Sequence, residues 1–216
     1  MTKREENEIY TILDSTYPNV KTALDFTNPV ECWVAVVLSA QCTDKRVNTI
    51  TPSLFKKYKT IKDYANANFD ELKKFIYSSG YYNSKTKKII DGAKYFQKLG
   101  FEGTILPNKF EELHNAPGIG KKTANVIYSQ IFNLNEGIAI DTHNKRIAAR
   151  IGISTGNVKQ IEEKLMKIYP RKNWRKISLL FVEHGRNICT ARNPKCNICP
   201  INKYCKYYNE TYLNDK

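Results

Sequence analysis

Residues 116–124 read Ala-Pro-Gly-Ile-Gly-Lys-Lys-Thr-Ala and predict a tight turn between two helices. The first helix ends near His114, and the second runs over about 121–132. Gly118 and Gly120 allow backbone angles that other residues avoid and let another group come close. The unpaired amides at the start of the second helix carry the positive end of its dipole. The pattern therefore predicts a helix-hairpin-helix that binds phosphate through its backbone.

An ordinary loop that caps a helix with glycine is the alternative interpretation of this stretch. Lys121 and Lys122, which follow the turn, and a net charge of +14 favour phosphate. A dinucleotide-binding fingerprint is excluded because no strand precedes the turn and the third glycine is missing.

Composition agrees with a nucleic-acid partner. The chain has 216 residues, 41% of them hydrophobic, which is enough for one large domain or two small ones that share a cleft. It carries 35 Lys and Arg against 21 Asp and Glu, which is typical of a protein with a polyanionic partner. A basic protein without such a partner remains open on charge alone.

The apolar pattern is helical almost throughout and predicts an all-α fold. The run 34–38 is too short for a membrane span of about 20 residues and indicates a buried core helix. Strand-like stretches such as 137–140 are too short to build a sheet. In one predicted helix Val158, Ile161, Leu165 and Ile168 form an apolar stripe. The predicted helices cover about 28–40, 44–58, 68–77, 83–99, 157–168 and 175–188.

The first ten residues are charged and contain no apolar signal region, so we expect a cytoplasmic, nucleoid-associated protein. In a reducing cytosol the six cysteines are not expected to form a disulfide framework. Cys32 and Cys42, far from the other four, are expected to be buried thiols.

Four cysteines near the end of the chain have the spacing C-x6-C-x2-C-x5-C and predict one metal centre. The uneven spacing favours an iron–sulfur cubane over zinc, which usually takes two close pairs, but spacing alone leaves zinc open. A loop held between the first two cysteines would present Arg192 and Lys195 to phosphate. The four are Cys189, Cys196, Cys199 and Cys205.

Lys122 and Asp141 are the candidates for chemistry. Lys122 lies in the first turn of a helix, where the dipole and adjacent Lys121 disfavour its charged form and so favour an amine nucleophile. Asp141, in Ile-Asp-Thr-His at 140–143, starts another helix. From local sequence alone, a surface lysine and a helix N-cap or first-turn acid are the favoured interpretations of the two residues.

The chain resembles the endonuclease III family of DNA glycosylases. The resemblance rests on Gly-Ile-Gly-Lys-Lys-Thr-Ala at 118–124, Ile-Asp-Thr-His at 140–143, Leu-Ser-Ala-Gln-Cys-Thr-Asp at 38–44 and the four-cysteine spacing. These motifs occur in the family's order and cover about 28–205. Four separate motifs are far more specific than any one of them.

The resemblance implies a base-excision repair glycosylase with abasic-site lyase activity. In such an enzyme Lys122 attacks the sugar C1′ of an oxidised pyrimidine nucleotide, and a Schiff base forms. β-Elimination then cuts the strand 3′ to the abasic site. Asp141 deprotonates the lysine or stabilises positive charge on the sugar. The four cysteines hold a four-iron, four-sulfur cluster, and a monovalent cation in the hairpin is a second candidate ligand.

The resemblance also implies contacts with damaged double-stranded DNA. Gln41 and Tyr81 fill the gap that a flipped nucleotide leaves. Tyr81 is a departure, since many relatives have leucine there, and it puts the lesion and opposite-base preference in doubt. Thr142, His143 and Arg146 approach phosphates near the pocket. His184 is expected in the core or beside the metal ligands.

The family's layout implies two helical domains that flank a DNA-binding cleft in a monomer. A central domain of 25–132 carries the helix-hairpin-helix, and residues 1–24 plus 133–216 form the domain with the cluster. Two alternatives remain. A monofunctional mismatch- or adenine-specific glycosylase is disfavoured by Lys122, and a non-enzymatic DNA-binding module fits everything except the pair of Lys122 and Asp141.

Overall fold

The computed structural model describes residues 2–213, and every regular element in that range is a helix. The predicted all-α fold is confirmed. The chain divides into two compact units: a middle unit, Thr22–Glu136, and a terminal unit, Met1–Lys21 with Gly137–Lys216. Each unit has its own hydrophobic core. No helix in the described range is long and apolar enough to cross a membrane.

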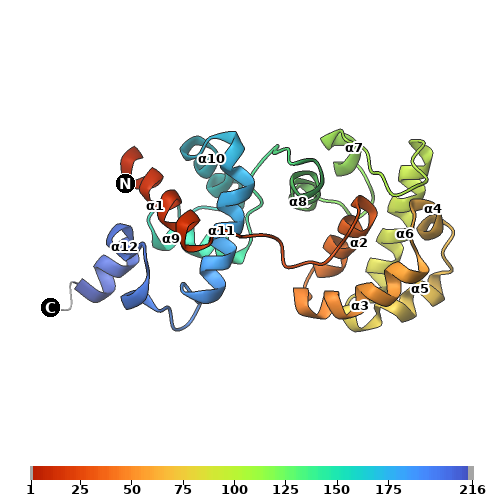
Figure 1. The fold of residues 1–216 in the computed structure, drawn as a ribbon, viewed down its shortest axis with the longest axis horizontal. Coiled ribbons are helices and arrows are strands. Elements are labelled where there is room, and N and C mark those ends of the chain that lie inside the picture. Colours follow the sequence, from red (N-terminus) through yellow and green to blue (C-terminus); the bar gives the residue numbers. More distant parts are fainter. Residues whose placement is uncertain (1, 214–216) are drawn as a thin grey trace. The chain divides into compact units, whose positions relative to one another are not determined.

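The middle unit, orange to green in Figure 1, is built around α2. In this unit α2 lies between α6 and α8 (Figure 1). The unit contains α2 (Pro29–Ser39), α3 (Asp44–Lys57), α4 (Ile61–Ala65), α5 (Phe69–Ile76), η1 (Tyr77–Ser79), α6 (Tyr82–Lys98), α7 (Phe110–His114) and α8 (Lys121–Phe132).

Helix α2 begins and packs as its sequence predicts. Asn28 caps its first turn by accepting a hydrogen bond from the Glu31 amide at 3.0 Å, and Pro29 occupies the first helical position. Trp33 is fully buried and meets Phe96 edge to face, with ring centroids 5.1 Å apart. A Cβ on Gly92 would lie 2.7 Å from the Trp33 ring, so only glycine lets α6 approach α2 this closely.

The terminal unit joins the start of the chain to its end. Helix α1 packs on α11, and Ile9 and Leu13 of α1 are fully buried. The unit contains α1 (Lys3–Thr16), α9 (Thr142–Arg150), α10 (Val158–Ile168), η2 (Arg171–Asn173), α11 (Trp174–Asn187), η3 (Cys196–Ile198), η4 (Asn202–Tyr204), α12 (Lys206–Tyr208) and η5 (Asn209–Leu213).

Some details differ from the sequence predictions. Val158 is 52% exposed because it occupies the first position of α10, before the apolar stripe reaches the core; Ile161 and Leu165 are buried. Cys42 is only half-buried, since it follows α2 in the loop before α3, whereas Cys32 is fully buried. The apolar pattern did not predict α1 or the short α4, both of which begin with a capping box at a threonine.

Candidate functional site

The predicted hairpin is present between α7 and α8. Gly118 has a φ of +82°, in the left-handed region, and the Ile119 amide donates to the Ala116 carbonyl at 3.0 Å to close the turn. Gly120 is the N-cap of α8 and offers no side chain to cap the first turn. The amides at the start of α8 therefore lie at a helix end that no side chain of the N-cap residue covers.

The two glycines of the hairpin have different roles. Gly120 has ordinary extended angles, φ −79° and ψ 170°, so the expectation that it needs special backbone freedom is wrong. A Cβ there would meet nothing within 4 Å, which leaves open space beside the helix end. A Cβ on Gly118 would lie 2.7 Å from Cβ and Cγ of Lys88. Gly118 serves the turn, and Gly120 keeps the approach to α8 open.

A cavity of about 200 Å³ in the middle unit brings three predicted DNA-contact segments together. Its lining includes Gln41 after α2, Tyr81 before α6, and Gly118 of the hairpin. A larger hollow of about 790 Å³ lies in the terminal unit, between the α9–α10 loop and Lys206, and contains none of the predicted site residues. We therefore take the smaller cavity, where the predicted contacts meet, as the candidate functional site of the middle unit.

Gln41 and Tyr81 share an uncommon backbone conformation. Their φ angles are +52° and +49°, in the left-handed region that side-chain-bearing residues rarely adopt. Tyr81 is 67% exposed, and Gln41 is also exposed. Each therefore presents its side chain from a strained turn, and such strain tends to occur at functional sites.

Lys122 and Asp141 belong to different units. Lys122 is exposed in the first turn of α8 in the middle unit. Asp141 is half-buried at the N-cap of α9 in the terminal unit, and its Oδ1 accepts from both the backbone amide and Nδ2 of Asn144 at 2.9 Å. The Asp141 carboxylate is thus a helix cap through one oxygen, while Oδ2 lies outside the cap.

The residues after Asp141 divide into exposed and internally bonded ones. Thr142 is exposed, and His143 and Arg146 are half-buried. The Arg146 guanidinium donates to the carbonyls of Gly185 at 3.0 Å and Cys189 at 2.9 Å, so it fastens α9 to the end of α11. It also lies 3.0 Å from Nδ1 of His143.

The four cysteines near the end of the chain line one pocket in the terminal unit. No carboxylate lines it, and His184 does. Four thiols without carboxylates fit an iron–sulfur cluster. Among residues 2–213 no group of three His, Cys, Asp or Glu side chains is arranged to hold a single metal ion. The four thiols are those of Cys189, Cys196, Cys199 and Cys205.

His184 lies beside these thiols, as predicted, and is 1% exposed. Its Nε2 is 3.5 Å from Sγ of Cys199, and its Nδ1 is 3.1 Å from the Tyr17 hydroxyl. Burial lowers the pKa of His184 to about 4. The histidine links Tyr17, the residue that follows α1, to the cysteine loop.

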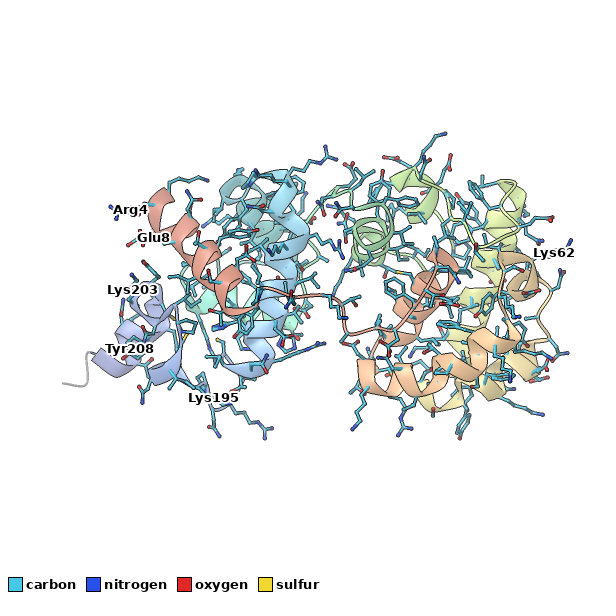
Figure 2. All side chains as sticks on the ribbon, viewed as in Figure 1. Arg4, Glu8, Lys62, Lys195, Lys203 and Tyr208 are labelled. Atoms are coloured by element: carbon cyan, nitrogen blue, oxygen red, sulfur yellow. The ribbon has the colours of Figure 1, made fainter. Side chains whose placement is uncertain are left out.

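Arg150, which sequence reasoning missed, fixes the loop between Cys189 and Cys196. Its guanidinium donates to the Thr190 carbonyl at 2.7 Å, to the Ala191 carbonyl at 2.9 Å and to Sγ of Cys189 at 3.2 Å. Arg192 and Lys195 on this loop are exposed, and Figure 2 shows Lys195 at the outer edge of the unit. Arg150 follows Arg146 by one helical turn on α9, a spacing that could have drawn attention to it.

Comparisons with known proteins agree with this geometry. Residues 34–171 match the model of the HhH-GPD superfamily base excision DNA repair proteins, and residues 189–205 match the iron-sulfur binding domain of endonuclease III. The endonuclease III of Rickettsia felis is 42% identical over 209 residues, which cover 96% of this chain and 97% of that protein.

Two similar solved structures contain DNA. A non-covalent endonuclease III–DNA complex aligns with a TM-score of 0.90 at 34% identity, over 100% of both chains. A trapped endonuclease III–DNA covalent intermediate, an estranged-adenine complex, aligns with a TM-score of 0.89 at 35% identity, over 97% of this chain and 98% of that one.

The all-helical fold, the hairpin and the four-cysteine loop define a helix-hairpin-helix base-excision DNA repair enzyme with an iron–sulfur cluster. Within that class the chain belongs to the endonuclease III family. Its activity is that of a DNA glycosylase and abasic-site lyase acting on oxidised pyrimidines, and its cofactor is a four-iron, four-sulfur cluster. The prediction of the cluster is confirmed, and the zinc interpretation of the spacing is not supported.

Proposed function

We propose that Lys122 is the amine nucleophile and Asp141 the carboxylate of this reaction. The Lys122 amine attacks C1′ as the bond from C1′ to the damaged base breaks. Loss of the ring oxygen bond then gives the Schiff base, and removal of a C2′ proton expels the 3′ phosphate by β-elimination. The covalent DNA intermediate trapped with a related endonuclease III supports a nucleophile on the protein.

The geometry of Asp141 carries this proposal. Bonds from Asn144 fix Oδ1, which orients the carboxylate, while Oδ2 is left to accept a proton or face positive charge. Lys122 is exposed at the start of α8, where a substrate can reach its amine. One carboxylate thus combines a structural bond with a chemical role.

The DNA contacts follow from the elements described above. Gly118, Gly120 and Lys121 bind the phosphates of one strand through the hairpin, and Gln41 and Tyr81 fill the gap left by the flipped nucleotide. A second set of proposed contacts belongs to the terminal unit. Thr142, His143 and Arg146 follow Asp141 on α9, and Arg192 and Lys195 lie on the cysteine loop.

The four cysteines of the loop, Cys189, Cys196, Cys199 and Cys205, are the proposed ligands of the cluster, which holds the basic loop in shape. The two domains are proposed as 25–132 and 1–24 plus 133–216, and damaged double-stranded DNA is the proposed partner of both. The protein acts as a monomer in the cytoplasm, on nucleoid DNA.

Borohydride trapping tests the assignment of the catalytic residues. A Schiff base formed on duplex DNA with one abasic site is reduced to a permanent cross-link. The parent protein is expected to cross-link and Lys122→Ala is not. Asp141→Asn keeps an oxygen that can accept the Asn144 amide, so it should fold normally yet react roughly 100-fold more slowly.

Lys121→Ala is the matched control, since it removes an exposed lysine from the same helical turn. It is expected to need more protein for half-maximal binding but to cross-link fully at saturation. Full trapping of Lys122→Ala would refute the role of this lysine. An unchanged rate for Asp141→Asn would refute the role of the carboxylate.

A further inference from the structure

Lys85, on α6, is a buried cation that the reaction described above does not use. It is 3% exposed, and its Nζ donates to the Leu38 carbonyl at 2.8 Å and to the Ser79 carbonyl at 2.7 Å. Within the described residues it meets these two carbonyls and no carboxylate. Burial lowers the pKa of the amine. Burying an ammonium is unfavourable unless its N–H groups are bonded, so this arrangement indicates a position where geometry matters.

The two carbonyls belong to the segments that carry Gln41 and Tyr81. Leu38 is in the last turn of α2, three residues before Gln41. Ser79 ends η1, two residues before Tyr81. Both Gln41 and Tyr81 have left-handed backbones, and both line the cavity that Lys85 lines. The Lys85 ammonium therefore bonds to the backbone just before each of two exposed residues in a strained conformation.

The segment around Tyr81 is unusual over two consecutive residues. Gly80 has φ +69° and ψ 156°, a region that only glycine enters readily, and Tyr81 follows at φ +49° and ψ 28°. Such a conformation persists only when surrounding contacts hold it. The bond from Lys85 to the Ser79 carbonyl is a buried contact immediately before this turn.

We propose that Lys85 is a positioning residue that holds Gln41 and Tyr81 in place before DNA arrives, so that they enter the duplex as a preformed pair. This inference rests on the proposed function of Gln41 and Tyr81 as fillers of the gap. A preformed pair loses little conformational freedom on binding, which favours flipping. Its effect should be largest where flipping is most difficult, in a well-paired duplex.

The first experiment needs no DNA. Amide hydrogen exchange is measured in the parent, in Lys85→Met, which keeps the length of the side chain, and in Lys87→Met, an exposed neighbour on the same helix. Amides of 39–43 and 79–82 are expected to exchange at least about tenfold faster in Lys85→Met, because a buried bond at each segment is lost. Unchanged exchange in Lys85→Met would overturn the proposal, whatever Gln41 and Tyr81 do on DNA.

The second experiment measures single-turnover base excision on two duplexes. One holds the lesion opposite its normal partner, and the other holds it in a short unpaired bubble. Lys85→Met is expected to react about tenfold more slowly on the paired duplex and within about threefold of the parent on the bubble, where unstacking is already complete. An equal loss on both duplexes would show a merely structural role and refute the proposal.

Two further variants keep the outcomes separate. Gly80→Ala strains the same turn with Lys85 intact, and nothing within 4 Å obstructs the added methyl. It is expected to show the same selective loss even where Lys85→Met fails to fold, and an equal loss on both duplexes would count against the proposal. Tyr81→Ala tests the filler itself. If Tyr81→Ala has no effect while exchange responds to Lys85→Met, the filler assignment is wrong and the positioning contact stands.

Discussion

Exchanging each hairpin glycine for alanine should separate folding from DNA binding. At Gly118 the backbone has φ +82°, where a residue with a Cβ is less stable by about 1–2 kcal/mol. The new Cβ would also lie 2.7 Å from two carbons of Lys88, which must move. Together these effects should lower the free energy of unfolding by about 2 kcal/mol, since overpacking of this kind adds roughly 1 kcal/mol.

At Gly120 neither effect applies. Its angles are ordinary and its Cβ would meet nothing, so Gly120→Ala should lower the stability only by the difference between glycine and alanine at an N-cap, about 0.5–1 kcal/mol. The methyl would instead occupy the space through which, in the proposed contact, a phosphate reaches the amides of α8. The proposed hairpin contact therefore predicts weaker DNA binding with a smaller loss of stability than in Gly118→Ala.

Both variants are measured by urea unfolding, followed by circular dichroism, and by DNA binding at fixed salt. For a chain of this size, a loss of about 2 kcal/mol also lowers the Tm by roughly 4–8 °C. A Gly118→Ala protein as stable as the parent would refute the argument from backbone strain. A Gly120→Ala protein that binds DNA like the parent would refute the phosphate contact at this position.

Further outcomes are expected at three places in the molecule. The buried Tyr64 hydroxyl has no partner among the described residues, so Tyr64→Phe should raise the unfolding free energy by about 1 kcal/mol in urea titrations. Because burial raises the pKa of Tyr64, unfolded tyrosine ionises first, and stability falls as the pH rises above about 10; this fall should be smaller in Tyr64→Phe. Arg150→Leu removes the bonds that hold the cysteine loop and should speed the loss of the cluster's visible absorbance under a chelator several-fold. Arg192→Gln and Lys195→Gln should each lower the slope of log K against log salt by about 0.9 if each contacts one phosphate.

Two of these sites have control variants in the same unit. Tyr95→Phe removes the hydroxyl of a half-buried tyrosine of the middle unit and is the matched control for Tyr64→Phe. Lys159→Gln changes an exposed lysine on α10 and should leave the salt slope unchanged. The argument for Tyr64 is contradicted if Tyr64→Phe is less stable than the parent. The argument for Arg150 is contradicted if Arg150→Leu loses its cluster at the parental rate. Unchanged salt slopes in the loop variants would contradict the phosphate contacts.

The parts of the site that sequence predicted are those set by neighbours in the chain. The turn at Gly118, the start of α8 and the cap at Asp141 depend on residues within a few positions, and the structure has them where the sequence placed them. The prediction that Val158 belongs to the buried stripe was wrong, because an apolar stripe does not indicate where along a helix the core ends.

Contacts between distant segments were not predictable in this way. Lys85 reaches a carbonyl 47 positions away, and Arg150 reaches one 40 positions away. Both side chains bond to backbone carbonyls. Every residue type provides such a carbonyl, so the sequence does not indicate which residue will be the hydrogen-bond partner. A buried lysine and a half-buried arginine therefore look like two of the 35 basic residues until the fold is known.

The basic residues consequently serve two different purposes that charge alone does not separate. Lys121, Arg192 and Lys195 are exposed and can meet phosphate, whereas Lys85 and Arg150 use their charge inside the protein to hold backbone in place. In the roles proposed here, the second group sets the backbone geometry in which the first group and the strained Tyr81 meet DNA. An enzyme that must find rare lesions without reading sequence depends on such preset geometry, because the phosphate contacts give affinity but cannot distinguish a damaged base from an intact one.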